Sequence, residues 1–218
     1  MLDRFDVVVF DWDGTLSDST AAIVRAIQDA AADLGLPVPD DATASHVIGL
    51  GLHEALARAV PTLPSERIPE YSERYRVHYL AREADLVLFP GARELIADLR
   101  EAGLLLAIAT GKSQRGLQRA LAGAGLSVEF VATRCADQTH PKPHPAMLLE
   151  LADELMVAPQ RMLMVGDTTH DLQMAEAANA AAVGLAQGAH PREQLAACRP
   201  LALFDSLEQF HRWLVPSR

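Results

Sequence analysis

The sequence predicts an α/β protein in which a doubly wound parallel, Rossmann-like sheet forms the core and an α-helical cap is inserted into it. Three observations predict this fold. Short runs typical of buried strands alternate with helical patterns along most of the 218 residues. Polar residues follow the ends of these runs. One long segment near the start of the chain holds helical patterns alone.

Four apolar runs have the length and composition of buried strands. The first, FDVVVF, is rich in β-branched residues, and the second begins after the turn signal Glu101-Ala102-Gly103. The third stops at Gly166-Asp167, and the fourth follows an alanine-rich helical pattern. The runs cover residues 5–10, 104–110, 162–165 and 181–185. Because helical patterns separate them, we expect parallel strands with ligands outside their carboxyl ends.

The segment from Asp18 to about Phe89 has a different pattern. Three stretches have helical spacing, and no strand-like run interrupts them. These stretches cover residues 20–36, 52–60 and 65–86. Phe89-Pro90-Gly91 has turn chemistry that returns the chain to the main domain. We therefore expect a core domain of residues 1–16 and 90–218 and a helical cap domain of residues 17–89.

Composition and charge argue against several classes of protein. Half of the residues are hydrophobic, and the formal charge of −10 gives no basic surface for nucleic acid or for an anionic membrane. Cys135 and Cys198 lie in unrelated contexts, which argues against a disulfide framework or a zinc site. Asp11 interrupts the first apolar stretch, which is too short for a signal peptide. We expect a cytoplasmic monomer or homodimer without nucleic-acid or membrane partners.

Asp11 and Asp13 follow the first run with one residue between them. On an extended chain both carboxylates point into the crevice at the strand end, while Trp12 faces away. Two acids this close repel, which favours protonation of one, while a divalent cation holds the other ionised. The pair therefore suits a nucleophile and an acid, although a polar strand-to-turn junction is the simpler alternative. Gly14 permits a tight turn with N–H groups facing an anion, and Thr15 can hydrogen-bond that turn.

Two further segments offer groups for an anion. Thr110-Gly111-Lys112-Ser113 ends the second run and opens a helical pattern, so its hydroxyl and amides suit a phosphoryl oxygen. An ordinary helix cap explains the same residues. Lys142 lies in HPKPHP, where Pro141 and Pro143 stiffen the loop. We expect its ammonium to offset the charge of the aspartates and a phosphoryl group, the alternative being a solvated loop lysine.

Asp167 and Asp171 suggest a metal site. Asp167 lies at the end of the third run, and Asp171 follows four residues later, where a loop or first helical turn presents both to a cation. Ligands that are all oxygen favour Mg²⁺. For Asp171 the alternative is an acid placed at a helix N-terminus by the helix dipole.

With these segments the chain resembles the haloacid dehalogenase superfamily over essentially its whole length. The resemblance is to the phosphoglycolate phosphatase-like branch, which has a helical cap after the first motif. DWDGT resembles the first family motif and Thr110 of IATGKS the second. Lys142 of HPKPHP resembles the third motif, and GDTTHD resembles the fourth.

This resemblance implies a Mg²⁺-dependent phosphatase acting on a small phosphorylated metabolite. Asp11 would attack phosphorus to give an aspartyl-phosphate, and Asp13 would protonate the leaving oxygen and then activate water. The implied metal ligands are Asp11, the backbone carbonyl of Asp13, and Asp167, with Asp171 in support. The implied phosphate-binding residues are Thr110 and Lys142, to which we add Gly14 and Gly111 for the backbone N–H groups of the turn and of the helix start.

The resemblance leaves the substrate open, because the cap loops of the family choose the leaving group. In HVIGLGLHEALARAV, Gly49 and Gly51 suit a mobile or closely approaching loop, with His53 or Arg58 meeting a substrate carboxylate or hydroxyl. The alternative is that the leucines of this stretch pack a helix and that Arg58 is solvated.

Three other activities compete with the phosphatase. A phosphomutase would return the phosphate of the same aspartyl-phosphate to a sugar. A carbon–halogen hydrolase would keep the Asp11 nucleophile but has little use for Asp13. A phosphorylation-receiver module also gathers acids, a threonine and a lysine at strand ends, but it needs neither a helical cap nor an acid two residues after its phosphorylated aspartate.

Overall fold

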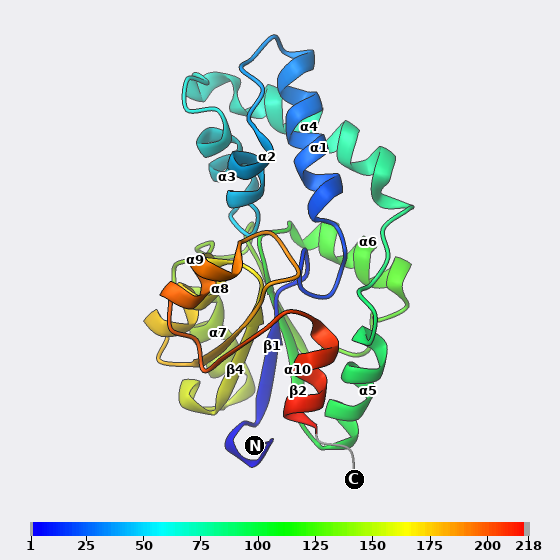
Figure 1. Ribbon diagram of the computed structural model, residues 1–218, viewed down its shortest axis with the longest axis vertical. Coiled ribbons are helices and arrows are strands. Elements are labelled where there is room, and N and C mark those ends of the chain that lie inside the picture. The colour runs from blue at the N-terminus through cyan, green and yellow to red at the C-terminus, as the bar shows by residue number, and fades with distance from the viewer. Residues whose placement is uncertain (1, 216–218) are drawn as a thin grey trace.

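The computed structural model describes residues 2–215 and has a parallel sheet flanked by helices, with a helical cap above it (Figure 1). The strand order in the sheet is β3-β2-β1-β4-β5-β6, and every neighbouring pair is parallel. The strands are β1 Val7–Phe10, β2 Leu105–Thr110, β3 Ala132–Cys135, β4 Met162–Gly166, β5 Ala181–Leu185 and β6 Ala202–Phe204. The predicted fold class is confirmed.

Helices cover both faces of the sheet, because alternate side chains of each buried strand point to opposite sides. Val8 and Phe10 of β1 belong to one apolar cluster with α5, α6 and α10, whereas Val7 and Val9 belong to another with α7, α8 and α9. The helices of the first face are α5 Ala92–Glu101, α6 Gln114–Ala124 and α10 Leu207–Leu214. Those of the second are α7 Ala146–Leu155, α8 Thr169–Ala177 and α9 Arg192–Ala197.

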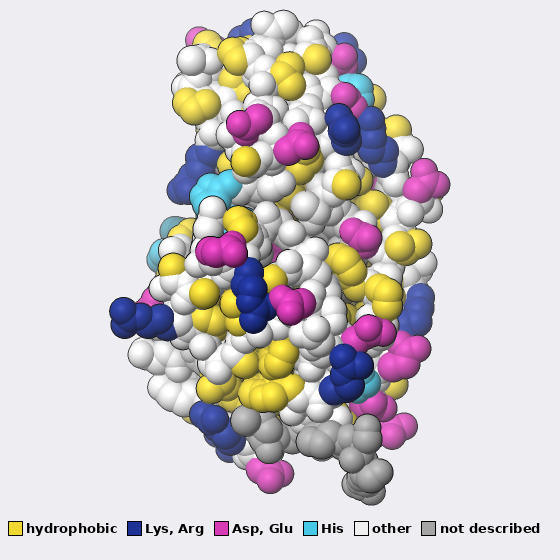
Figure 2. Space-filling model, viewed as in Figure 1, with side chains coloured by type: hydrophobic (Ala, Val, Ile, Leu, Met, Phe, Trp, Pro, Cys, Tyr) yellow, Lys and Arg dark blue, Asp and Glu magenta, His cyan; other side chains and the backbone are white. Residues whose placement is uncertain are grey.

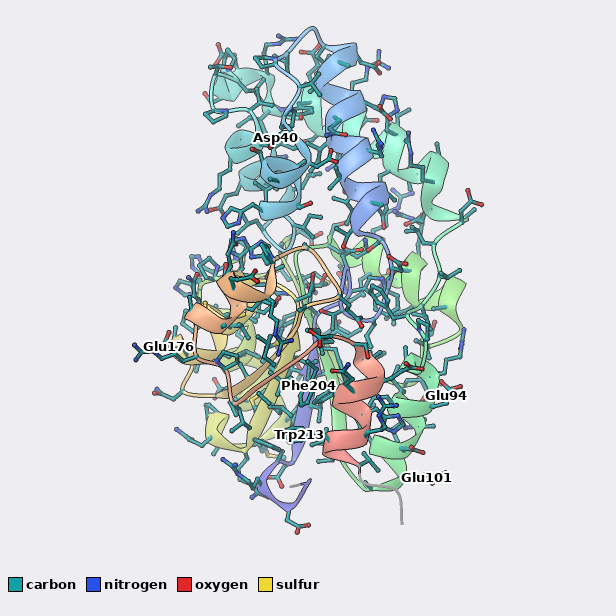
Figure 3. All side chains as sticks on the ribbon, viewed as in Figure 1. Asp40, Glu94, Glu101, Glu176, Phe204 and Trp213 are labelled. Atoms are coloured by element: carbon teal, nitrogen blue, oxygen red, sulfur yellow. The ribbon has the colours of Figure 1, made fainter. Side chains whose placement is uncertain are left out.

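The sequence does not predict two of the strands, β3 and β6, which form the two edges of the sheet. β3 reads ATRC, and its two middle residues are only partly buried, so it lacks a continuous apolar run. β6 has three residues, all partly buried. Phe204 of β6 packs on Trp213 of α10 with ring centroids 5.3 Å apart (Figure 3). Edge strands are therefore specified by such tertiary contacts more than by local pattern.

The cap consists of four α-helices that bury an apolar cluster of their own (Figure 1). They are α1 Thr20–Asp33, α2 Asp41–His46, α3 Leu52–Ala59 and α4 Ile68–Glu83. The Tyr71 hydroxyl of α4 donates to the Ile27 carbonyl of α1, 2.9 Å away. The sequence does not predict α2, a six-residue helix that starts where the Asp40 carboxylate accepts from the Thr43 amide. Short 3-10 helices cover Leu2–Arg4, Ser65–Arg67 and Pro159–Arg161.

Two antiparallel linkers join the cap to the core. The amide of Asp18 donates to the Val87 carbonyl, and the amide of Phe89 donates to the Leu16 carbonyl, each over 2.9 Å. Ser17 and Leu88 form the bridge between them. The linkers thus pair close to the positions predicted as domain boundaries.

The molecular surface mixes charges of both signs. On the face shown in Figure 2, acidic and basic side chains are interspersed over the cap and the core. Within residues 2–215, no helix has the length and apolar character needed to cross a membrane.

Candidate active site

Three carboxylates meet at the carboxyl ends of β1 and β4. Asp11 follows β1, Asp167 follows β4, and Asp171 lies in the first turn of α8. Because Phe10 pairs with Val165 in the sheet, the residues that follow these strands emerge side by side. One carboxylate oxygen from each acid lies within 4.8 Å of the others, and all three side chains are buried. We call Asp11, Asp167 and Asp171 the carboxylate cluster.

Lys142 lies against the carboxylate cluster. Its Nζ is 2.8 Å from Oδ1 of Asp11 and 2.6 Å from Oδ1 of Asp171, and its side chain has no exposed surface. Burial alone lowers the pKa of Lys142, but the charges of Asp11 and Asp171 more than offset this effect, so its pKa lies above its ordinary value. Lys142 is therefore a fixed cation within the site.

The carboxylate cluster holds more negative charge than Lys142 neutralises. Burial raises the pKa of Asp11 to about 7, and the charge of Asp171 adds to this effect. Burial, with the charges of Asp11 and Asp171, also raises the pKa of Asp167 well above its usual range. Among the described residues, no hydrogen-bond partner reaches the buried Oδ2 of Asp11. An oxygen-rich site with excess negative charge and an unused ligand atom fits a divalent cation.

The first motif, residues 11–15, and the fourth motif, residues 166–171, contact each other at Asp167. The Thr15 hydroxyl donates to Oδ1 of Asp167, and the Ala189 amide donates to Oδ2, each over 2.7 Å. Gly14 has a φ of +81°, and a Cβ at this position would lie 2.2 Å from Oδ2 of Asp167. Only glycine fits this turn. The amide of Gly14 itself donates to the Ser17 carbonyl within this turn.

Asp171 is both a helix cap and a site residue. The backbone amide and the hydroxyl of Thr168 donate to Oδ2 of Asp171 over 3.0 and 2.7 Å. The Asp171 amide returns a 3.3 Å bond to the Thr168 hydroxyl, which completes a capping box for α8. Its other oxygen, Oδ1, pairs with Lys142. The two interpretations of Asp171 from sequence are therefore compatible.

Thr110 and Gly111 end β2 beneath the cap. The Thr110 side chain is buried, and its hydroxyl accepts from the Lys112 amide over 3.2 Å. A Cβ at Gly111 would lie 2.5 Å from the Leu50 carbonyl oxygen and 2.7 Å from that of Gly49. Gly111 thus allows the cap backbone to approach the end of β2.

Asp13 is separate from the carboxylate cluster and contacts groups at the boundary between cap and core. The Ser19 hydroxyl donates to its Oδ1 over 2.7 Å. Lys112 Nζ lies 3.0 Å from Oδ1 and 2.9 Å from Oδ2, and it also donates to the Tyr79 hydroxyl of α4 over 2.8 Å. Trp12 faces the core, as expected.

Lys112 is not among the predicted site residues, although the composition contains a signal for it. Only two of the 19 basic residues are lysines, at positions 112 and 142. Both are buried against catalytic candidates, whereas all other basic side chains are arginines. Tyr79 carried no comparable signal, because only the folded cap brings it to Lys112.

Three histidines join cap and core beside the carboxylate cluster. His46 of α2 stacks on His190 with ring centroids 4.6 Å apart, and His170 of α8 contacts both rings edge-on. Nε2 of His170 and Nε2 of His190 each lie 3.0 Å from the His46 carbonyl oxygen. The Thr169 amide donates to Nδ1 of His190, so Nε2 carries the proton and the ring is neutral. Burial lowers the pKa of His190 to about 4.

The cap closes over the site. Asp11, Lys142, Asp167 and Asp171 are all at most 1% exposed. Residues 47–51, which we call the cap loop, lie over the core: Gly49 is next to Thr168, and Gly51 is next to Pro141. His53 is exposed, and Arg58 pairs with Glu54 over 2.6 Å on the cap surface. Substrate entry from this arrangement requires the cap to move.

Comparison with known proteins places this site in a family. The family model for haloacid dehalogenase-like hydrolases matches residues 8–185. The chain is 38% identical over 210 residues to the protein named Probable phosphatase IndB of Dickeya dadantii, covering 93% of this chain and 90% of that protein. It is 30% identical over 220 residues to a phosphoglycolate phosphatase of Haemophilus influenzae, covering 96% of this chain and 98% of that protein.

A solved structure shows the same fold. The crystal structure of a predicted phosphoglycolate phosphatase from Haemophilus somnus superposes with a TM-score of 0.85 at 27% identity, covering 97% of each chain. The chain belongs to the haloacid dehalogenase-like hydrolase family. Within it, the chain is an enzyme of the phosphatase type, so the predicted family and enzyme class are confirmed over the receiver-module alternative.

Proposed function

We propose that the protein is a Mg²⁺-dependent phosphatase that hydrolyses a small phosphate monoester, in the manner of a phosphoglycolate phosphatase, through an aspartyl-phosphate on Asp11. The observation that carries this proposal is the position of Lys142, whose Nζ contacts Asp11 and Asp171 inside a buried carboxylate cluster. A fixed cation beside a buried nucleophile suits the transfer of a charged phosphoryl group.

Mg²⁺ would be held by Asp11, the backbone carbonyl of Asp13, and Asp167, with Asp171 in support. When bound, it would offset the charge of these oxygens and of the phosphoryl group. The cluster fits this role because its donors are all oxygen and Oδ2 of Asp11 has no other partner among the described residues.

The reaction follows from the two aspartates that flank Trp12. Asp11 attacks phosphorus, the bond from phosphorus to the ester oxygen breaks, and Asp13 gives its proton to the departing alcohol. Asp13 then takes a proton from water as the water attacks phosphorus. Orthophosphate leaves and Asp11 is regenerated.

The phosphoryl oxygens need donors that are already in place. The Thr110 hydroxyl, the Gly111 amide and the Lys142 ammonium all lie at the carboxyl end of the sheet, close to the expected position of the phosphoryl group. Donors fixed before substrate arrives stabilise developing charge without reorganising. Gly14 contributes through the shape of the turn beside Asp167.

The decisive test is orthophosphate release from phosphoglycolate and other small monoesters by wild-type protein and Asp11→Asn in the presence of Mg²⁺. We expect Asp11→Asn to lose activity by about 10³-fold or more, because no other group replaces the nucleophile. Asp6→Asn is the matched control, since Asp6 precedes the other end of β1 and pairs with Arg161. Turnover retained by Asp11→Asn, or undiminished after exhaustive chelation, would contradict the proposal. Phosphate release without a sugar bisphosphate distinguishes it from a phosphomutase.

A further inference from the structure

Lys112 is a buried ammonium at the boundary between cap and core. Its side chain is only 9% exposed, and its Nζ contacts both oxygens of Asp13 and the hydroxyl of Tyr79. The ammonium also lies 4.7 Å from the centroid of the Tyr79 ring. Removing an ammonium from water is costly unless its charge is paired, so this position has a specific requirement for a cation.

The two lysines of the chain have different surroundings. Lys142 pairs with two carboxylates, those of Asp11 and Asp171. Lys112 pairs with one, that of Asp13, and its other hydrogen-bond partner is the neutral phenol of Tyr79. Lys112 can therefore accept a second anion, or exchange Asp13 for one, without leaving a buried carboxylate cluster unpaired.

Tyr79 adds a donor to this position. Its hydroxyl accepts the hydrogen bond from Lys112, and no described residue accepts a bond from it in return. Burial raises the pKa of Tyr79 to about 12, so the phenol keeps its proton at neutral pH. An ammonium and an O–H donor therefore lie 2.8 Å apart. Two adjacent donors of this kind match the two oxygens of a carboxylate.

The position of Lys112 relates these donors to the alcohol part of the substrate. Asp13 is the proposed proton donor to the leaving oxygen, and Lys112 contacts the carboxylate of Asp13 directly. The leaving oxygen and Lys112 thus share Asp13 as a neighbour. Lys142 instead contacts Asp11, the proposed nucleophile. A group that meets Lys112 must be only a few bonds from the ester oxygen.

We propose that Lys112 and Tyr79 bind the leaving group and select phosphate monoesters of short hydroxy acids, whose carboxylate takes the place of Asp13 on Lys112. This rests on the proposed function, because only phosphoryl transfer to Asp11 puts an alcohol beside Asp13. The exchange frees Asp13 to bond the leaving oxygen. Since Tyr79 belongs to α4, the carboxylate is bound by both donors only when the cap is closed.

The test compares two esters in the full-length protein with Mg²⁺: phosphoglycolate, which carries a carboxylate, and n-propyl phosphate, which does not. We expect Lys112→Met to lower kcat/KM for phosphoglycolate about 100-fold more than for n-propyl phosphate, because a buried charge pair is lost with one ester only. Tyr79→Phe should shift the same ratio about 10-fold, because it removes one donor. Because each ester is compared between variant and wild type, its intrinsic reactivity cancels from the ratio of the two changes in kcat/KM.

Tyr75→Phe is the matched control, because the Tyr75 ring stacks on that of Tyr79 with centroids 5.8 Å apart, whereas the hydroxyl that bonds Lys112 is that of Tyr79. Its ratio should equal that of wild type. If Lys112→Met does not fold, an inhibition experiment on the wild-type protein tests the same proposal. Glycolate should inhibit n-propyl phosphate hydrolysis, and glycolamide, which has no carboxylate, should not.

The outcomes separate the two proposals. If the wild-type protein hydrolyses neither ester, the proposed phosphatase function fails. If it hydrolyses both and Lys112→Met lowers both rates equally, or if glycolate and glycolamide inhibit alike, the selection by Lys112 is overturned and the phosphatase stands.

Discussion

Ser19 donates a 2.7 Å hydrogen bond to Asp13 from the residue that precedes the first helix of the cap. A serine at this position normally caps its helix, yet the Ser19 side chain makes no capping bond. Its hydroxyl instead holds the carboxylate that we propose as the proton shuttle. Asp13 is therefore linked to α1 through Ser19 and to α4 through Lys112 and Tyr79.

Ser19→Ala should lower kcat about 10-fold while changing KM less than about threefold, because the shuttle loses its orientation and the phosphoryl site does not. Stability should change little, since no cap is lost. Ser206→Ala is the control with the opposite pattern: the Ser206 hydroxyl accepts from the Gln209 amide, so its loss should cost about 1 kcal/mol of stability without loss of activity. Steady-state kinetics and chemical denaturation of both variants check the pair. Equal activity of Ser19→Ala and wild type would contradict the role given to Ser19.

Gly111→Ala tests how closely the cap must approach β2. The new Cβ would lie 2.5 Å from the Leu50 carbonyl oxygen, so the cap loop must shift outward. We expect kcat/KM to fall about 100-fold, because a displacement of about 1 Å in a catalytic site has an effect of this size. Gly123→Ala, in α6, meets nothing within 4 Å and should keep full activity while stabilising the helix by about 0.5–1 kcal/mol. A Gly111→Ala variant as active as Gly123→Ala would show that the closed contact is dispensable.

In the metal-free protein, the contribution of Asp11 to stability should fall as pH rises from about 4 to about 7. Burial raises the pKa of Asp11 from 3.8 to about 7, so the folded state binds more protons than the unfolded state in this window. Above it, the cost of the buried charge is fully present. In chelator at pH 8, Asp11→Asn should therefore melt about 3 °C or more above wild type, and this difference should shrink toward pH 5. Thermal unfolding followed by circular dichroism measures it, and a lower melting temperature for Asp11→Asn at pH 8 would refute the prediction.

His190 gives the opposite dependence on pH. Burial lowers its pKa from 6.5 to about 4, so the unfolded state binds the extra proton between these values. The contribution of His190 to stability is complete above about pH 6.5 and is lost as pH falls toward 4. His190→Gln keeps a donor and an acceptor but does not titrate. Relative to this variant, the free energy of unfolding of wild type should fall by up to about 1.4 kcal/mol for each pH unit by which the pH is lowered in this window. Denaturation of the two proteins at several pH values gives the difference, which should be constant if His190 is not the titrating group.

The sequence predicted the centre of the sheet and not its edges. β1, β2, β4 and β5 lie within continuous apolar runs, because each is covered by helices on both faces. At β3, Thr133 and Arg134 are partly buried, and Arg134 reaches Glu150 of α7 instead of entering the core. The sequence of such a strand has no regular pattern of apolar residues that distinguishes it from a loop. Its place follows from pairing with β2.

The site, like the sheet, has residues that the sequence predicted and residues that it did not. Asp11, Thr110 and Asp167 could be predicted, because a parallel sheet brings the ends of its strands together whatever the cap does. Lys142 could be predicted because Pro141 and Pro143 stiffen the loop that carries it. Lys112 and Tyr79 meet only because the folded cap brings α4 to the segment that follows β2. The contact between His46 and His190 joins residues 144 positions apart. Local sequence patterns contain no information about such contacts between the cap and the core.

The paired linkers bear on how this enzyme can diversify. Asp18 and Val87, at the two ends of the cap, are joined by one backbone hydrogen bond of 2.9 Å. A segment whose ends already touch can be exchanged for another of different length or sequence without stretching the chain that surrounds it. The sheet and the carboxylate cluster would be untouched by such an exchange. Substrate range can therefore evolve by replacement of one contiguous module, while the reaction chemistry is inherited unchanged.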